Sequence, residues 1–176
     1  IMLNTKQIIV SVSVIALMGA LLVQPIKGLV DKNEGSSTTN TEADASSMYT
    51  LKSVSELSKQ SINSSLSQEI TAIEAEVEKA EGDEKVNLLQ DLANKWDDVA
   101  KPIPQGFIYQ EMAKISPKFE YWLNAGDAFR AGYTNQQDTA LAASLNRLAI
   151  TSYEEALILD SNNLAAKTGL GAGLVT

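Results

Sequence analysis

The chain has 176 residues and a formal charge of −8, and it contains no cysteine and no histidine. These absences exclude a thiolate nucleophile, a disulfide, an imidazole base and a Cys/His zinc site, so any catalysis would depend on carboxylates, lysine, tyrosine and hydroxyls. We therefore expect a protein that is not an enzyme, with no catalytic residue, no metal site and no cofactor.

Residues 7–26, QIIVSVSVIALMGALLVQPI, form an uncharged stretch between Lys6 and Lys27. Twenty helical residues, at about 1.5 Å each, cover the roughly 30 Å hydrocarbon core of a bilayer. A cleaved signal peptide is the alternative, but its apolar part is usually only about 7–15 residues long and ends at a small-residue cleavage site. We expect residues 1–30 to be an uncleaved single-pass transmembrane anchor that meets the lipid bilayer through residues 7–26.

The orientation of this anchor follows from the length of its flanks, because the lysines on its two sides nearly balance. A short N-terminal flank commonly stays in the cytoplasm while the long domain after the first apolar segment is translocated. After residue 30 the chain carries 22 acidic and 12 basic residues. This excess of negative charge argues against a nucleic-acid partner.

Residues 31–48, DKNEGSSTTNTEADASSM, contain no large aliphatic residue before Met48. Such a composition buries too little apolar surface to offset the loss of chain entropy, so we expect a flexible polar linker. The serine and threonine content also fits a modified stalk.

Residues 49–84 are predicted to form N-terminal capping helices. One helical face carries apolar residues in steps of four, three and four, at Leu66, Ile70, Ile73 and Val77. We expect Gly82 to end this helix and the next one to begin near Lys85. A weaker pattern precedes it, at Leu51, Val54, Leu57 and Ile62. A coiled coil is the alternative for residues 66–77, but two heptads are too few, which favours a helix packed on the next helix pair.

The stretch WLNAGDAF, residues 122–129, places Trp122, Ala125, Gly126 and Phe129 at the spacing W-x2-L-G-x2-Y. A small residue in this pattern lets two helices approach closely, and the large residues on either side fill the remaining space. The second half of the pattern, A-x3-F and a closing proline, follows as Ala149, Tyr153 and Ala156, with Ser161 where proline would be usual.

The same spacing recurs upstream and downstream. The upstream residues are Leu89, Leu92, Ala93, Trp96, Tyr109, Met112 and Pro117. The downstream residues are Leu170, Gly171 and Leu174. Residues 85–176 therefore resemble the tetratricopeptide repeat family, with about two and a half repeats. The resemblance implies an all-α fold, a TPR-like α-solenoid of antiparallel helix pairs. Gln105 departs from the family pattern, because it occupies a position that is usually small.

Phe129 and Ala149 are twenty residues apart, eleven more than the repeat pattern requires. Leu141, Leu145 and Leu148 keep helical spacing through this insertion, so we expect an extended second helix over 138–159. Asp138 or Thr139 would cap its start.

The resemblance also implies a concave peptide groove lined by the first helix of each repeat. The candidate groove residues are Asn87, Gln90, Asn94, Asp98, Asp127 and Arg130, and the same family positions also include Asp97, Glu120, Leu123 and Ala131. Arg130 is the sole cation in this set, which argues against a clamp for a peptide carboxylate. Asn94 and Asp98 suit a peptide backbone or a basic side chain, and an ordinary solvated helix face is the alternative.

Fold alone does not identify a ligand. The resemblance implies a membrane-anchored scaffold or adaptor in a bacterial envelope, held in the inner membrane with its domain in the periplasm. It would bind other proteins and assist the assembly, secretion or folding of envelope proteins. The alternative is a structural accessory subunit of a larger membrane complex. Because the last repeat is half a repeat, we expect either that the natural chain continues or that another subunit covers this end.

Overall fold

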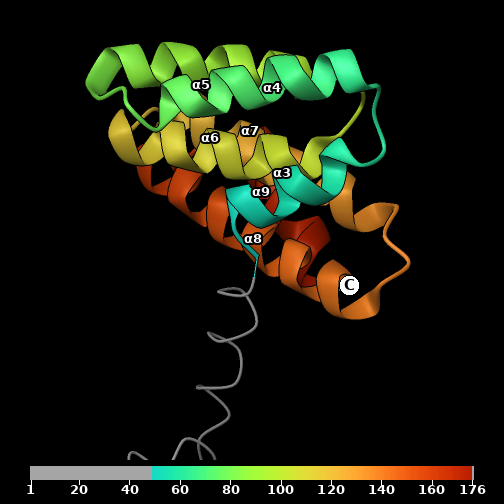
Figure 1. Cartoon of the computed structure of the whole chain (residues 1–176). Helices are drawn as coiled ribbons and strands as arrows, with labels where there is room; N and C mark the ends of the chain where they lie inside the picture. The colour runs from blue at the N-terminus through green and yellow to red at the C-terminus, as the bar shows by residue number, and fades with distance from the viewer. Residues whose placement is uncertain (1–48, 176) are drawn as a thin grey trace, which may run out of the picture. The chain divides into compact units, whose positions relative to one another are not determined.

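The computed structural model describes residues 49–175, and all regular structure in this range is α-helical (Figure 1). The helices are α3 (Leu51–Lys59), α4 (Ser64–Val77), α5 (Gly82–Asp97), α6 (Pro102–Ile115), α7 (Phe119–Thr134), α8 (Thr139–Leu159) and α9 (Leu164–Leu174). The all-α prediction is confirmed for this part of the chain.

The predicted anchor, residues 1–30, and the predicted linker, residues 31–48, lie outside the described residues. Between residues 49 and 175, no helix combines the length and the hydrophobicity needed to span a bilayer.

From α4 to α9 each helix packs against the next one, across turns of three or four residues. Helices that are packed together and joined by such short turns run antiparallel. Figure 1 shows α4 and α5 side by side at one end of this stack and α8 and α9 at the other. Helix α3 is the exception, because it packs mainly against α6 and less against α4, the next helix in the sequence. The arrangement is consistent with an α-solenoid.

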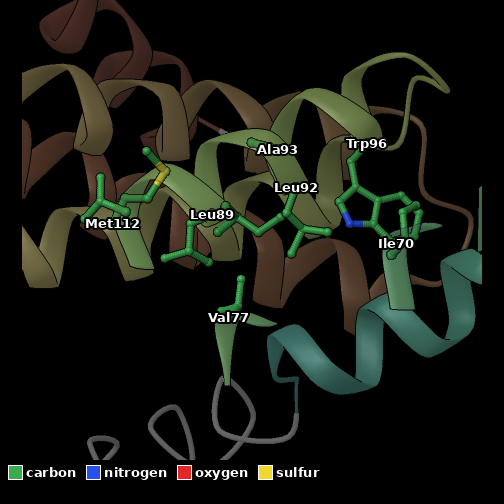
Figure 2. Close-up of a cluster of buried hydrophobic side chains, with 9 residues drawn as sticks. Ile70, Val77, Leu89, Leu92, Ala93, Trp96 and Met112 are labelled. Carbon is green, nitrogen blue, oxygen red and sulfur yellow. The ribbon is translucent and has the colours of Figure 1, made fainter. Parts of the chain in front are cut away.

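The first core cluster joins α4, α5 and α6 (Figure 2). Its labelled side chains are Ile70, Val77, Leu89, Leu92, Ala93, Trp96 and Met112, and none is more than 7% exposed. The spacing of the apolar residues in α4 places Ile70 and Val77 on the face that meets α5. Residues 64–77 therefore cover one side of the next helix, as a capping helix would.

The boundary between α4 and α5 differs from the predicted one. The sequence predicts that Gly82 ends the first helix, whereas α4 ends at Val77 and Gly82 is the first residue of α5. The amides of Lys79 and Ala80 donate to the carbonyl oxygen of Glu76 at 3.0 and 3.1 Å, which closes the last turn early. Gly82 has a φ of 56°, which glycine adopts at little cost, and this lets the chain turn directly into α5.

The second core cluster joins α7, α8 and α9. Its buried residues are Ala125, Phe129, Leu145, Ala149, Tyr153, Ala156 and Ala166. Phe107 of α6 meets Phe129 edge to face, with 5.0 Å between the ring centroids, and so joins α6 to this cluster. Tyr109 of α6 packs against both clusters. Two further motif residues, Tyr109 and Trp122, are half-buried, and Pro117 is exposed in the turn between α6 and α7.

The ring of Tyr153 lies between two glycines that come from different helices. A Cβ atom at Gly126 of α7 would lie 2.6 Å from Cε1 of Tyr153, and one at Gly169 of α9 would lie 2.3 Å from Cζ. Carbon atoms in ordinary contact are about 3.5–4.0 Å apart, so each approach requires the absence of a side chain. The close approach that the motif assigns to Gly126 is thus made against an aromatic ring of α8.

The register of α9 differs from the motif. A Cβ atom at Gly171 would meet nothing within 4 Å, and Leu174 is 67% exposed. The helix instead turns Ala166, Gly169 and Gly173 toward α8, where they are buried. The reason is steric, because the Tyr153 ring and the neighbouring aliphatic side chain of α8 leave room only for small residues.

Helix α8 begins at Thr139 and runs without a break to Leu159, over the range in which the sequence predicts an extended helix. Asp138, one of the two predicted caps, accepts from the amides of Ala140 at 2.9 Å and Leu141 at 3.2 Å. Between Phe129 and Ala149, α7 continues to Thr134, residues 135–138 form the turn, and residues 139–148 belong to α8.

Candidate peptide-binding groove

A groove of about 860 Å³ opens at the end of the domain where α5 ends and α6 begins. Its walls are α3, the turn from α5 into α6, and the C-terminal half of α7, with the start of α8 at one edge. This volume lies in the range of about 300–1,000 Å³ that is usual for ligand sites in proteins. We refer to it below as the α3–α7 groove.

Helix α3 supplies the apolar wall. Val54 and Leu57 both line the groove; Val54 is buried, whereas Leu57 stays 61% exposed. Ile103 and Ala131 lie across from α3, on α6 and α7. A large aliphatic side chain that faces a groove and remains in water indicates a surface that gains free energy when a ligand covers it.

A polar cluster holds α3 in place. The ammonium group of Lys59 lies 2.8 Å from a carboxylate oxygen of Glu74 in α4 and 2.6 Å from one of Glu56, and the hydroxyl of Ser55 donates to Glu74. The Lys59 side chain is only 9% exposed. Burial acts to lower the pKa of Lys59, but the hydrogen bonds and charges of Glu56 and Glu74 outweigh it, and the pKa is raised. The polar contacts of Lys59 and Ser55 with Glu74, together with the buried side chain of Val54, therefore fix this wall of the groove.

Asp97, the last residue of α5, is the first of two carboxylates in the groove. The buried amide of Gln105 donates to Asp97 Oδ1 and to the carbonyl oxygen of Ala93, both at 3.2 Å. Gln105 thus occupies a position at which the repeat pattern has a small residue, and its longer side chain makes these two hydrogen bonds. Its amide orients Asp97 without neutralising its charge.

Asp127 of α7 is the second carboxylate. The hydroxyl of Tyr153 donates to Asp127 Oδ1 at 2.7 Å, and Nη2 of Arg130 lies 3.7 Å from the same oxygen. Burial raises the pKa of Tyr153 well above its ordinary value, and the bond to Asp127 adds to this shift. Tyr153 therefore remains a protonated donor at neutral pH, and Asp127 is held by an uncharged group.

The predicted groove residues divide between two surfaces. Of the candidates, Asp127 lines the α3–α7 groove, together with the related positions Asp97 and Ala131. The candidates on α5, and Asp98 directly after it, do not line the groove; those on α5 are Asn87, Gln90 and Asn94. Gln90 instead donates to Asn94 Oδ1 at 3.1 Å along the outer face of α5. Arg130 stands beside the groove, with its side chain 47% exposed.

Sequence reasoning missed the contribution of α3 and of the turn before α6. The signal for α3 is weak, since Leu51, Val54 and Leu57 show helical spacing but nothing in it indicates that the helix packs on α6. In the turn, Ala100 has a φ of 51° and the amide of Lys101 donates to the carbonyl oxygen of Trp96 at 3.0 Å. This left-handed closure brings residues 100–104 to the edge of the groove.

No family model, no curated protein and no solved structure matches this chain. Among residues 49–175, no three acidic side chains gather as a group that could hold a metal ion. The features that bear on function are therefore the groove and the sequence patterns.

Proposed function

We propose that this chain is a protein-interaction scaffold that binds a segment of a partner polypeptide in the α3–α7 groove. The single observation that carries the proposal is the groove itself, which combines an exposed aliphatic wall with two carboxylates held by uncharged donors. Ligand sites in proteins commonly pair apolar walls with a few fixed polar groups.

The proposed architecture is a TPR-like solenoid. Its support is the W-x2-A-G-x2-F spacing of residues 122–129 and the variant of it upstream at residues 89–96, together with the stack of consecutive antiparallel helices and the close packing of Gly126 on Tyr153. Stacked helix pairs present an extended surface made from successive helices, which suits the binding of polypeptides. We propose no catalytic role for this chain.

The proposed location is the inner membrane of a bacterium, with residues 7–26 as a single-pass anchor and the helical domain in the periplasm. The support for the anchor is the uncharged stretch of twenty residues and the polar sequence that follows it, and the bacterial setting comes from the resemblance to membrane-anchored tetratricopeptide proteins. A scaffold at this place would assist the assembly, secretion or folding of envelope proteins that pass close to the membrane.

A second candidate function, a structural accessory subunit of a membrane complex, is favoured by a different surface. Large apolar side chains are exposed at the end of the stack. Ile158 of α8 is 74% exposed, and Leu164 of α9 is 77% exposed. Leu174 and Val175, at 67% and 85%, extend the same end. Exposed apolar groups of this size often mark a protein contact, and a fixed subunit would cover them permanently.

Photo-crosslinking in intact cells separates the two functions. A photoreactive amino acid at Leu57 or Ala131 samples the groove, the same residue at Leu164 samples the end of the stack, and Asp91 on the exposed side of α5 is the control. The scaffold function predicts several exchangeable polypeptides crosslinked from the groove positions. A single partner of constant stoichiometry, crosslinked from Leu164 alone, would instead establish the structural subunit. Groove positions that crosslink no more than Asp91 would reject the scaffold.

A further inference from the structure

We propose that the partner segment bound in the α3–α7 groove is cationic, with a lysine or arginine side chain placed between Asp97 and Asp127. This inference rests on the proposed function and adds the chemistry of the ligand. Both carboxylates line one groove although they come from different helices, α5 and α7.

The charges of these carboxylates are not neutralised by their closest partners. Asp97 is bonded by the amide of Gln105 at 3.2 Å, and Asp127 by the hydroxyl of Tyr153 at 2.7 Å. Each carboxylate has about four lone-pair positions, so one neutral donor leaves most of them open. The Asp127 side chain is 52% exposed, which keeps the remaining positions accessible. A pre-oriented anion of this kind favours a charged donor from a ligand.

Two cations of the chain compete for this site, and neither occupies it fully. Arg130 lies 3.7 Å from Asp127, which is beyond hydrogen-bonding distance, and its side chain is 47% exposed. Lys101 lines the groove from the turn before α6. The groove lining holds two carboxylates and one lysine, and Arg130 stands at its edge, so the local formal charges balance. A ligand cation binds by taking the open positions of the carboxylates in place of these two side chains. The formal charge of −8 on the whole chain adds a long-range attraction for cations.

The apolar lining fits the rest of such a side chain. Lysine and arginine carry long methylene stems that pack on apolar surface while their charged ends reach polar groups. Leu57 on α3 and Ile103 on α6 offer that surface within the same groove. An acidic or an uncharged segment would cover the apolar wall but would leave both carboxylates without a charged partner.

The test uses the full-length chain in a neutral detergent and three short fluorescent peptides, observed by fluorescence anisotropy. The first peptide carries two lysines around a leucine pair, the second has glutamine in place of the lysines, and the third has glutamate. We expect the lysine peptide to bind most tightly. We expect Asp97→Asn and Asp127→Asn each to weaken its binding by about three- to tenfold, which is the range for a hydrogen bond to a charged group at a partly exposed site.

Three controls make the result specific. The glutamine peptide should bind Asp97→Asn and Asp127→Asn as it binds the wild type. Lys101→Gln should strengthen binding of the lysine peptide, because it removes the competing cation from the groove. Asp91→Asn removes an acidic charge from the exposed side of α5, outside the groove, and should change binding less than either groove variant.

Equal affinities for the three peptides, or loss of binding no greater in the groove variants than in Asp91→Asn, would overturn the cationic inference. Failure of all three peptides to bind would overturn it as well. In each of these cases crosslinks from Leu57 or Ala131 in cells would still support the scaffold function, so the two proposals fail on different observations.

Discussion

Replacement of Gly169 by alanine tests how α9 is held on the domain. The added Cβ atom would lie 2.3 Å from Cζ of Tyr153 and within 2.7 Å of two further atoms of the ring. The ring has little freedom to move away, because Gly126 of α7 also lies close to it, at Cε1, Cδ1 and Cζ, and its hydroxyl is bonded to Asp127. The clash must therefore be relieved by a shift of α9 itself.

The expected change in the free energy of docking α9 is the balance of two opposing effects. Alanine in the interior of a helix is favoured over glycine by about 1 kcal/mol. Forcing an extra carbon into a packed core costs about 1–3 kcal/mol, and an approach more than about 1 Å inside normal contact belongs at the upper end of that range. We expect Gly169→Ala to destabilise the docking of α9 by about 1–2 kcal/mol. Gly171→Ala, where a Cβ atom meets nothing within 4 Å, should instead stabilise α9 by up to about 1 kcal/mol.

Hydrogen exchange with mass spectrometry on the full-length chain measures this difference, because α9 is the last helix of the stack and can open without global unfolding. The two variants should differ by about 2 kcal/mol, or roughly thirtyfold in the opening equilibrium of α9. Equal exchange in Gly169→Ala and Gly171→Ala would show that α9 does not pack on Tyr153 through Gly169. Slower exchange in Gly169→Ala than in Gly171→Ala would show that the motif register, and not the one described here, is correct.

Three further predictions concern other contacts. Asp138→Ala should destabilise the start of α8 by about 1 kcal/mol, seen as faster exchange in its first turn, because two backbone amides lose their acceptor. Glu74→Gln should loosen α3 by about 1 kcal/mol in the same measurement. Since the pKa of Lys59 is raised above 10.5 in the folded chain, its contribution is complete below that pH and is lost as the pH rises through the raised value. Protection of α3 should therefore fall at high pH in the wild type and fall less in Glu74→Gln. Ser152→Val should lower the free energy of unfolding by about 1–3 kcal/mol in urea denaturation, because the buried amide of Gln110 loses its partner, and Gln110→Met should cost less.

Most of the helices of the domain could be predicted because their apolar residues repeat at helical spacing. In α4, Ile70 and Val77 lie two helical turns apart, and both are buried. In α5, Leu89 lies one turn before Leu92 and is buried as well. Asp138 could be identified as a cap because its side chain satisfies amides within three residues. These features are local, so the sequence within a few turns decides them.

The features that sequence reasoning missed depend on distant contacts. The motif predicts that α9 approaches its neighbour closely at Gly171. Glycines occupy positions 169, 171 and 173 of α9, and the Tyr153 ring of α8 determines that Gly169 makes the close approach. The placement of α3 depends on the buried side chain of Val54 and on the ion pair between Lys59 and Glu74, which joins α3 to α4. No spacing rule relates those residues to one another. The groove was missed for the same reason, because α3 forms one of its walls.

The packing of α9 and the chemistry of the groove meet at Tyr153. Its ring is enclosed by Gly126 and Gly169, and its hydroxyl holds Asp127 at 2.7 Å. Arg130, three residues further along α7, lies 3.7 Å from the same carboxylate oxygen. Without the hydroxyl, Asp127 is free to move toward Arg130 and form a closer pair within its own helix.

Tyr153→Phe separates these two roles, because it keeps the ring and removes the hydrogen bond. We expect it to leave the exchange of α9 nearly unchanged and to weaken binding of the lysine peptide about threefold, since Arg130 then neutralises Asp127. Adding Arg130→Gln should restore the affinity, because the competing cation is gone. If Tyr153→Phe binds the lysine peptide as the wild type does, Tyr153 acts only in packing. If the double variant stays as weak as Tyr153→Phe, the loss arises from Asp127 having lost its orientation and not from Arg130.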